Sequence, residues 1–364
     1  MNDRCVALLG RRDQPTDALE EYCHFLGVAL AAHGISLRLE RVLWHEFGWK
    51  KALAKLEAPA EEQKNHWVLI QYTALAWSRR GIPLRLASLV RFLQKHGARC
   101  GVVFHDAQPY GGSRLVDRVR RQVQTRLMQR LASLADLAVL TVPREKVKWL
   151  RADARNIVFI PVGANLPSPE TAWAQEKGPP GRLPTVSVFS LSDGRVGEDE
   201  VQAIVRVMIF VAKEIGRVRL LVFGRHAKDA EKLLRESLRA TDVELDLRGI
   251  LSTENAVRAL GESDVMLFAR GPISSRRGSA IAGIACGLPV VAEEGLETAA
   301  PITEAGVVLV KHGEPFGPAL LRVLSDSAYR ESLSDLSREA QRNHFSWEAI
   351  AKQYIAALRG REET

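Results

Sequence analysis

The sequence predicts an α/β protein with two domains, each built on a parallel, doubly wound sheet. Short apolar runs typical of buried strands alternate with helical periods along nearly the whole chain, and that order favours parallel sheets. A stretch rich in proline and glycine, residues 169–183, interrupts the alternation near mid-chain. At 364 residues the chain also exceeds one average domain. We therefore expect domains over residues 1–168 and 184–345, joined by a linker over 169–183.

The first domain is predicted from six apolar runs and the helical periods between them. The expected strands are 4–9, 35–42, 66–72, 99–104, 137–141 and 157–161. The expected helices are 16–33, 83–96 and 113–134. Residues 43–65 contain no clear period, and no element is predicted there. In such sheets ligands bind beyond the carboxyl ends of the strands, so residues that follow strands are candidates for a site.

The second domain repeats the same rhythm after the linker. The expected strands are 186–191, 218–223, 243–248, 264–269 and 290–292. The expected helices are 198–215, 228–238, 254–260, 279–286, 318–324, 328–343 and 347–358. No sequence repeat is evident, but two similar α/β halves would place two strand edges beside a cleft.

Composition excludes several classes of protein. No run of about 18 apolar residues is present, so no membrane-spanning helix is expected, and the N-terminus lacks the pattern of a signal peptide. Only 6% of residues are aromatic, which argues against a nucleic-acid platform. The cysteines Cys5, Cys23, Cys100 and Cys286 are scattered in apolar segments without metal-ligand spacing. They indicate reduced core thiols in a cytoplasmic protein.

The net charge of +8 is concentrated in one part of the chain. Residues 51–150 hold 18 Lys and Arg against 7 Asp and Glu, which suggests an anionic partner. Within this part, the predicted helix 113–134 combines an apolar stripe with flanking arginines. The stripe consists of Leu115, Val116, Val119, Val123, Leu127, Met128 and Leu131. Two interpretations stay open: contact with an anionic membrane surface, or packing on the core with a solvated basic face.

The segment 270–292 contains the sequence's clearest candidate site. A loop with Ser274, Arg276 and Arg277 leads into a helix that begins near Gly278 and Ser279. Free backbone N–H groups at a helix start attract anions, and the two arginines add charge there. The alternative is an ordinary connection whose small residues only allow a helix to pack closely on a sheet.

Five segments stand out in order along the chain: VVFHD (Val102–Asp106), FIPVGANLP (Phe159–Pro167), LGESDVMLFA (Leu260–Ala269), IACGLPVVA (Ile284–Ala292) and HFSWEAIAKQYIAAL (His344–Leu358). Together they resemble segments of the family 4 glycosyltransferases. The resemblance implies the glycosyltransferase B fold, two Rossmann-like domains facing a cleft, with the terminal helix 346–364 packing back on the first domain. It also implies retaining transfer of a hexose from a nucleotide-sugar, without a metal or cofactor.

Several family positions are changed in this chain. The two glutamates of the family, one near the sugar and one on the ribose, would fall at Ser274 and Ala282. The Arg and Lys that hold the diphosphate would fall at Ser190 and Arg195. We therefore expect Arg195, Arg276 and Arg277, with the amides of Gly278 and Ser279, to balance the phosphate charge. Relatives also place donor contacts at the strand end occupied here by Gly224 and Arg225.

The candidate catalytic residues follow the predicted strand 99–104. His105 would contact the acceptor or the sugar and hold or share a proton near neutral pH, whereas its alternative role is to cap the strand end. Asp106 would either orient His105 or cap the next turn. The acceptor-side candidates are Gln71, Tyr72 and Thr73, after another strand, and Thr16 and Asp17, whose alternative role is N-capping of the first helix.

Together these patterns predict a hexosyltransferase that uses a nucleotide-sugar donor and a glycan or lipid-linked acceptor. Its expected setting is surface polysaccharide or glycolipid assembly, an association that rests on the fold. We expect it in the cytoplasm or peripherally on the inner face of the membrane, without a nucleic-acid partner. The alternative is a non-catalytic relative that binds a nucleotide or glycan, which the absent glutamates favour.

Overall fold

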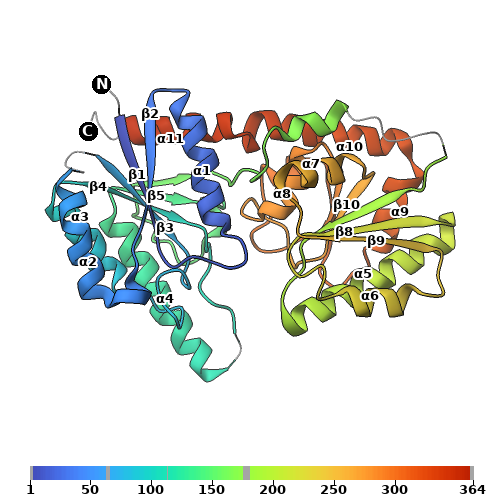
Figure 1. Cartoon of the computed structure of the whole chain (residues 1–364), viewed down its shortest axis with the longest axis horizontal. Coiled ribbons are helices and arrows are strands. Elements are labelled where there is room, and N and C mark those ends of the chain that lie inside the picture. Colours follow the sequence, from blue (N-terminus) through green and yellow to red (C-terminus); the bar gives the residue numbers. More distant parts are fainter. Residues whose placement is uncertain (1–2, 63–65, 113, 175–180, 361–364) are drawn as a thin grey trace. The chain divides into compact units, whose positions relative to one another are not determined.

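The computed structural model describes residues 3–62, 66–112, 114–174 and 181–360. Contacts divide the chain into two units (Figure 1): unit 1 comprises Met1–Pro161 with Trp347–Thr364, and unit 2 comprises Val162–Ser346. Within the stretch expected as a linker, Pro169–Ala174 forms a short 3-10 helix. It packs in unit 2, where the Trp173 indole N–H donates to the Ala285 carbonyl at 2.9 Å. Residues 175–180 of the expected linker lie outside the described residues.

Unit 1 is built on a six-stranded sheet in the order β2-β1-β3-β4-β5-β6. Its strands are β1 (Asp3–Leu9), β2 (Ile35–Arg41), β3 (Trp67–Tyr72), β4 (Arg99–Phe104), β5 (Leu137–Leu140) and β6 (Ile157–Phe159). Every pairing is parallel, so the carboxyl ends of all six strands meet at one edge. The strand β3 is buried at every position, which explains its continuous apolar run.

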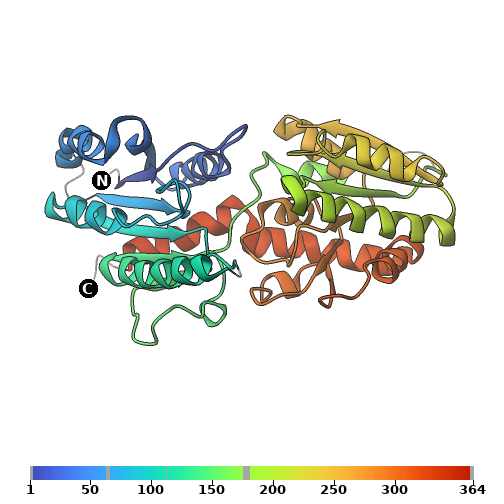
Figure 2. The same cartoon turned by 90° about the horizontal axis from the view of Figure 1, so that it is seen from below.

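Helices lie on both sides of this sheet (Figures 1 and 2). They are α1 (Ala18–Ala31), α2 (Trp44–Glu62), α3 (Leu86–Lys95), α4 (Leu115–Leu134) and α11 (Trp347–Arg359). The helix α2 occupies a stretch for which the sequence predicts no element. Gly48 has a φ of 74° and a ψ of 158° inside it, so two helical segments meet at a kink and no single helical period runs through the stretch.

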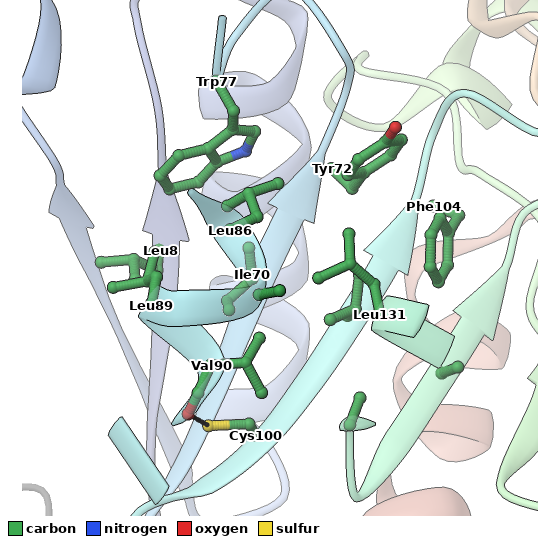
Figure 3. Close-up of a cluster of buried hydrophobic side chains, with 14 of the residues drawn as sticks. Leu8, Ile70, Tyr72, Trp77, Leu86, Leu89, Val90, Cys100, Phe104 and Leu131 are labelled. Atoms are coloured by element: carbon green, nitrogen blue, oxygen red, sulfur yellow. Dashed lines mark hydrogen bonds between the residues drawn. The ribbon is translucent and has the colours of Figure 1, made fainter. Parts of the chain in front are cut away.

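The main core of unit 1 lies between the sheet and the helices α2, α3 and α4. Alternate strand residues such as Leu8, Ile70 and Phe104 point into it (Figure 3). From the helix side, Leu86 and Leu131 complete the packing and are almost fully buried. This core fixes the ends of β3 and β4, which carry the acceptor-side candidate residues.

The terminal helix α11 packs against α1 on the other side of the unit 1 sheet. The two phenolic oxygens of Tyr22 and Tyr354 lie 2.9 Å apart in a buried hydrogen bond. The Trp347 ring stacks on Phe25, with ring centroids 5.7 Å apart and an interplanar angle of 12°. These contacts join the last helix to the first unit.

We expect Tyr354→Phe to lower the free energy of unfolding by about 1–3 kcal/mol, because it leaves the buried Tyr22 hydroxyl without a partner. Urea denaturation would measure the change. Tyr110→Phe is the matched control, since Tyr110 is 50% exposed in the same unit. Equal stability of the two variants would show that the buried pair contributes nothing.

Unit 2 contains a second six-stranded sheet, in the order β12-β11-β10-β7-β8-β9. Its strands are β7 (Thr185–Phe189), β8 (Val218–Phe223), β9 (Val243–Gly249), β10 (Val265–Phe268), β11 (Val290–Glu293) and β12 (Val307–Val310). All of its pairings are parallel. The sequence analysis does not predict the short edge strand β12, whose first three residues are only half-buried.

The helices of unit 2 largely follow the predicted periods. They are α5 (Gly194–Ile215), α6 (Glu231–Leu238), α7 (Thr253–Gly261), α8 (Gly278–Ala285), α9 (Gly317–Ser325) and α10 (Ser327–Ala340). A π-helical turn, Gln341–Phe345, follows α10. The helices α5, α6 and α9 cover the core of this sheet. Each unit is therefore a Rossmann-like α/β domain with a wholly parallel sheet, as the sequence predicts.

Candidate functional site

The carboxyl edge of the unit 2 sheet carries two residues with unusual backbone conformations. Ser190, after β7, has a φ of 65°, and His226, after β8, has a φ of 59°. Non-glycine residues with positive φ are uncommon and cluster at functional sites. A Cβ on Gly224 would come within 2.5 Å of Ser190 Oγ, and the backbone N–H of Arg225 donates to that oxygen at 3.2 Å. The structure thus brings together Ser190, Gly224 and Arg225.

A cavity of about 530 Å³ lies beside the first turns of α5 and α6. Its ionisable lining is mixed in sign and consists of Asp193, Glu198, His226, Asp229, Lys232 and Glu236. Across the described residues, no group of three His, Cys, Asp or Glu side chains converges in a way that could hold a metal ion. The predicted phosphate ligand Arg195 is exposed in the first turn of α5.

The loops after β8 and β10 carry four guanidinium groups, which we call the arginine cluster. Its members are Arg225, Arg270, Arg276 and Arg277. Arg270 lies within electrostatic range of Arg225 and Glu200, and Arg277 lies within range of Arg270, Arg276 and the carboxylates of Glu200 and Glu297. Positive charges outnumber negative ones within this set. Such an excess in a partly buried place favours an anionic ligand.

Among the four arginines, Arg277 has the guanidinium group whose pKa is lowered to about 10. Burial, and then the positive charge of Arg276, cause this lowering of its pKa. Its Nε is buried and has no hydrogen-bond partner among the described residues. Buried donors in proteins are nearly always bonded, so this atom indicates a missing acceptor.

Arg276 is held by Glu297, which lies in the loop after β11. Arg276 Nε donates to Glu297 Oε2 at 2.6 Å, and Nη2 lies 3.4 Å from Oε1. The hydroxyl of Ser274 donates to the same Oε2 at 3.3 Å. The Glu297 carboxylate therefore lies beside Ser274, although it comes from the loop after β11 and not from the loop that carries Ser274.

The first turn of α8 lies directly after these arginines. Arg277 is the N-cap residue, and it forms no side-chain capping hydrogen bond. Gly278 is exposed and Ser279 half-buried, so the first amide groups of the helix are accessible. The positive end of the helix dipole adds to the charge of the arginine cluster.

In unit 1, His105 follows β4 and lies among aromatic and amide side chains. Its Nε2 lies 2.8 Å from Gln71 Oε1, while Gln71 Nε2 donates to the Leu69 carbonyl at 3.3 Å. The Tyr22 ring packs edge-on against the imidazole at 4.9 Å between centroids. Loss of hydration lowers the pKa of His105 to about 3. This shift favours the neutral imidazole near pH 7, which can share a proton through one ring nitrogen but does not carry a second proton.

This low pKa predicts how acid affects stability. Below about pH 6.5 the unfolded chain protonates His105, whereas the folded chain does so only near pH 3. The free energy of unfolding should therefore fall as pH is lowered from 6.5 toward 3, by at most about 1.4 kcal/mol per pH unit from this residue. Urea titrations of the wild type and His105→Gln at pH 8, 6 and 5 would measure it. An identical pH slope for both proteins would contradict the assignment.

The other candidates beside β3 and β4 have structural contacts. Asp106 Oδ2 accepts the backbone N–H of Ala74 at 2.6 Å and so caps the loop after β3. Gln71 and Tyr72 are fully buried, and Tyr72 lies in the core (Figure 3). These two side chains do not line an open acceptor pocket, because β3 is covered on both faces. Thr73 is half-buried, and its hydroxyl accepts the Ala76 N–H at 3.3 Å.

Of the two candidates before α1, Thr16 and Asp17, the structure shows a capping role for Asp17. Asp17 is the N-cap residue, and its Oδ1 accepts the N–H groups of Leu19 and Glu20 at 3.2 and 3.3 Å. Arg41 Nη2 also pairs with its Oδ2 at 3.0 Å. The capping interpretation of Asp17 is confirmed. Thr16, just before it, is half-buried.

The basic helix α4 differs between its two halves. In the second half Leu127, Met128 and Leu131 are buried, which confirms core packing there. In the first half Leu115 is 77% exposed and Val116 63% exposed. No helix among the described residues is long and apolar enough to cross a membrane.

Comparison with solved structures identifies the fold as that of the B-type glycosyltransferases. A glycosyltransferase from Rickettsia africae is similar over 100% of this chain and 99% of its own, with a TM-score of 0.72 and 13% identity. Anabaena Alr3699/HepE, solved with UDP and glucose, is similar over 98% of this chain and 99% of its own, with a TM-score of 0.64 and 15% identity. WaaG, a glycosyltransferase involved in lipopolysaccharide biosynthesis, is similar over 98% of this chain and 100% of its own, with a TM-score of 0.61 and 13% identity. No protein-family model and no curated protein sequence matches the chain.

Proposed function

We propose that this protein is a family 4 glycosyltransferase that moves a hexose from a nucleotide-sugar to an acceptor hydroxyl with retention of configuration. One observation carries the proposal: the buried Nε of Arg277, beside the first turn of α8, has no hydrogen-bond partner within the described part of the chain. A diphosphate would supply the missing acceptor, since guanidinium groups and helix N-termini both bind phosphate well. The fold shared with UDP-bound HepE supports this proposal.

In the proposed site, unit 2 holds the donor. Arg276 and Arg277 would bind the diphosphate together with the amides of Gly278 and Ser279. Ser190, Gly224 and Arg225 would form the neighbouring wall, because they meet at the ends of β7 and β8. Arg195 would contribute charge from α5. The reaction would need no metal or cofactor, since the guanidinium groups would neutralise the leaving diphosphate.

Unit 1 would hold the acceptor, with His105 as the catalytic or orienting group. The bond to Gln71 makes Nε2 of the neutral ring the donor, which leaves Nδ1 as an acceptor for a hydroxyl hydrogen. Thr16 and Thr73 would be the nearby acceptor contacts. Asp106 and Asp17 would act through the backbone that they cap.

We also propose that the first half of α4 contacts an anionic membrane surface on the cytoplasmic side. Leu115, Val116 and Val119 are exposed there among arginines of the same helix, a pattern that suits an interfacial helix. A lipid-linked or glycolipid acceptor in surface polysaccharide assembly would be consistent with this placement. The similarity in fold to WaaG supports the choice of pathway.

The test is a donor assay with UDP-, GDP-, dTDP- and ADP-sugars, following sugar release to water and transfer to a membrane extract. We expect one nucleotide to support release or transfer, and Arg277→Ala to reduce the rate. The alternative function is a non-catalytic binding protein, favoured by Ser274 and Ala282, which are buried and carry no carboxylate. Tight nucleotide binding without turnover of any donor would support that alternative.

A further inference from the structure

A carboxylate inside the site proposed to bind a diphosphate requires an explanation. Glu297 lies in the arginine cluster with its side chain only 12% exposed. Placed there, its negative charge opposes the binding of any phosphate. The bonds from Ser274 and Arg276 hold it in this position, so the carboxylate is fixed beside the residues proposed to bind the diphosphate.

The contacts of Glu297 leave it able to bind a further hydrogen-bond donor. Oε2 accepts Arg276 Nε at 2.6 Å and the Ser274 hydroxyl at 3.3 Å. Oε1 accepts only the 3.4 Å contact from Arg276 Nη2 among the described residues. An ionised carboxylate offers about four acceptor positions on its two oxygens. In a nucleotide-sugar, the sugar is joined to the outer phosphate, so its hydroxyls lie next to the groups that hold that phosphate.

The charge of the cluster also suits the donor better than the product. The four guanidinium groups of the arginine cluster, taken with the carboxylates of Glu200 and Glu297 that act on Arg277, carry an excess of two positive charges. The diphosphate of an intact nucleotide-sugar carries two negative charges. After transfer, the terminal phosphate ionises further near neutral pH, with a second pKa of about 6 for a phosphate monoester. Glu297 opposes this additional charge.

We propose that Glu297 makes the site prefer the intact nucleotide-sugar over the spent nucleoside diphosphate. Its carboxylate accepts a hydrogen bond from a hydroxyl of the donor sugar and repels the more highly charged product. The proposal rests on the proposed function and extends it to donor selection and product release. The competing explanation is that Glu297 only neutralises Arg276.

The test compares binding of UDP-glucose and UDP by calorimetry in the wild type, Glu297→Gln and Glu297→Asp. The control is Glu294→Gln, which removes an exposed carboxylate from the same loop. We expect Glu297→Gln to bind UDP more tightly and UDP-glucose more weakly, so that the ratio of the two affinities shifts toward UDP by about tenfold or more. Glu297→Asp keeps the charge but retracts it, so UDP affinity should stay near wild type while UDP-glucose affinity falls. Glu294→Gln should leave the ratio unchanged.

The outcomes separate this proposal from the proposed function. If the wild type binds UDP and UDP-glucose but the ratio is unchanged in both Glu297 variants, Glu297 does not select the donor. If both ligands weaken equally, Glu297 only positions Arg276, and the proposal is also overturned. If the wild type binds no pair among the UDP, GDP, dTDP and ADP nucleotides and their sugars, the proposed function fails and takes this proposal with it. Thermal unfolding of each variant checks that it is folded. If Glu297→Gln does not fold, the ratio of UDP to UDP-glucose affinity in Glu297→Asp tests the proposal.

Discussion

Replacing Arg277 with alanine is expected to weaken UDP binding by about 10–150-fold, the effect of losing one charge-assisted hydrogen bond. Binding of free uridine should change little, because its contacts lie away from the phosphate. The reason is that Arg277 has a buried Nε without a partner among the described residues and a pKa lowered to about 10 by burial and by Arg276. Calorimetry with UDP and with uridine measures both effects.

Arg258→Ala is the matched control, since Arg258 is an exposed arginine on α7 of the same unit. It should bind both ligands like the wild type. An equal loss of UDP and uridine binding in Arg277→Ala would mean that Arg277 supports the fold. No loss of either would place the phosphate elsewhere.

The second large effect is expected at His105. His105→Ala should lower the rate of sugar transfer by at least about tenfold. A full general acid–base contribution is typically about 10²–10⁴-fold. The neutral imidazole, oriented by Gln71, would present Nδ1 to the acceptor hydroxyl, and alanine removes that acceptor. Initial rates at saturating donor measure the change.

Donor binding should be retained in His105→Ala, because the residue belongs to unit 1 and the donor site to unit 2. His24→Ala is the control, since His24 is exposed on α1. Unchanged turnover in His105→Ala would leave His105 as a strand-end residue with a packing role only.

The architecture was largely predictable because parallel strands buried on both faces have continuous apolar runs. The strand β8 begins and ends at the predicted residues, 218 and 223. The helix α2 was not predictable, since the non-helical backbone at Gly48 divides it into two short segments. The strand β12 was missed although it is as long as the predicted strand β10, and its apolar run Val307–Val310 is the signal that could have identified it.

The candidate site was predictable only where its residues are consecutive in the sequence. The loop with Ser274, Arg276 and Arg277 stands out because its charges and small residues lie together before a helix. Glu297 was missed because it lies on the loop after β11, and only the fold brings it within range of Arg277. Arg270 lies on the same loop as Arg277 but was not selected as a candidate. A charged residue close after a buried strand is the signal that could have identified both.

At the end of β3, the sequence predicted ligand contacts for side chains that the fold buries. A strand end suggests access to ligand, yet Gln71 and Tyr72 are fully buried. The loop from Ala74 to Trp77 closes over this strand end: the Trp77 indole N–H donates to the Gln71 carbonyl at 2.8 Å. No local pattern in the sequence reports such a long-range cover. The pKa of His105 depends on the same packing and was unpredictable for the same reason.

The central claim is that the arginine cluster and the first turn of α8 hold the diphosphate of a nucleotide. A crystal structure of the protein with UDP tests it most directly. We predict phosphate oxygens about 2.7–3.2 Å from Arg277 Nε and from the backbone nitrogen of Gly278 or Ser279, the normal range for hydrogen bonds from nitrogen to oxygen. A structure in which the diphosphate binds elsewhere, with Arg277 Nε still unpaired, would contradict the account.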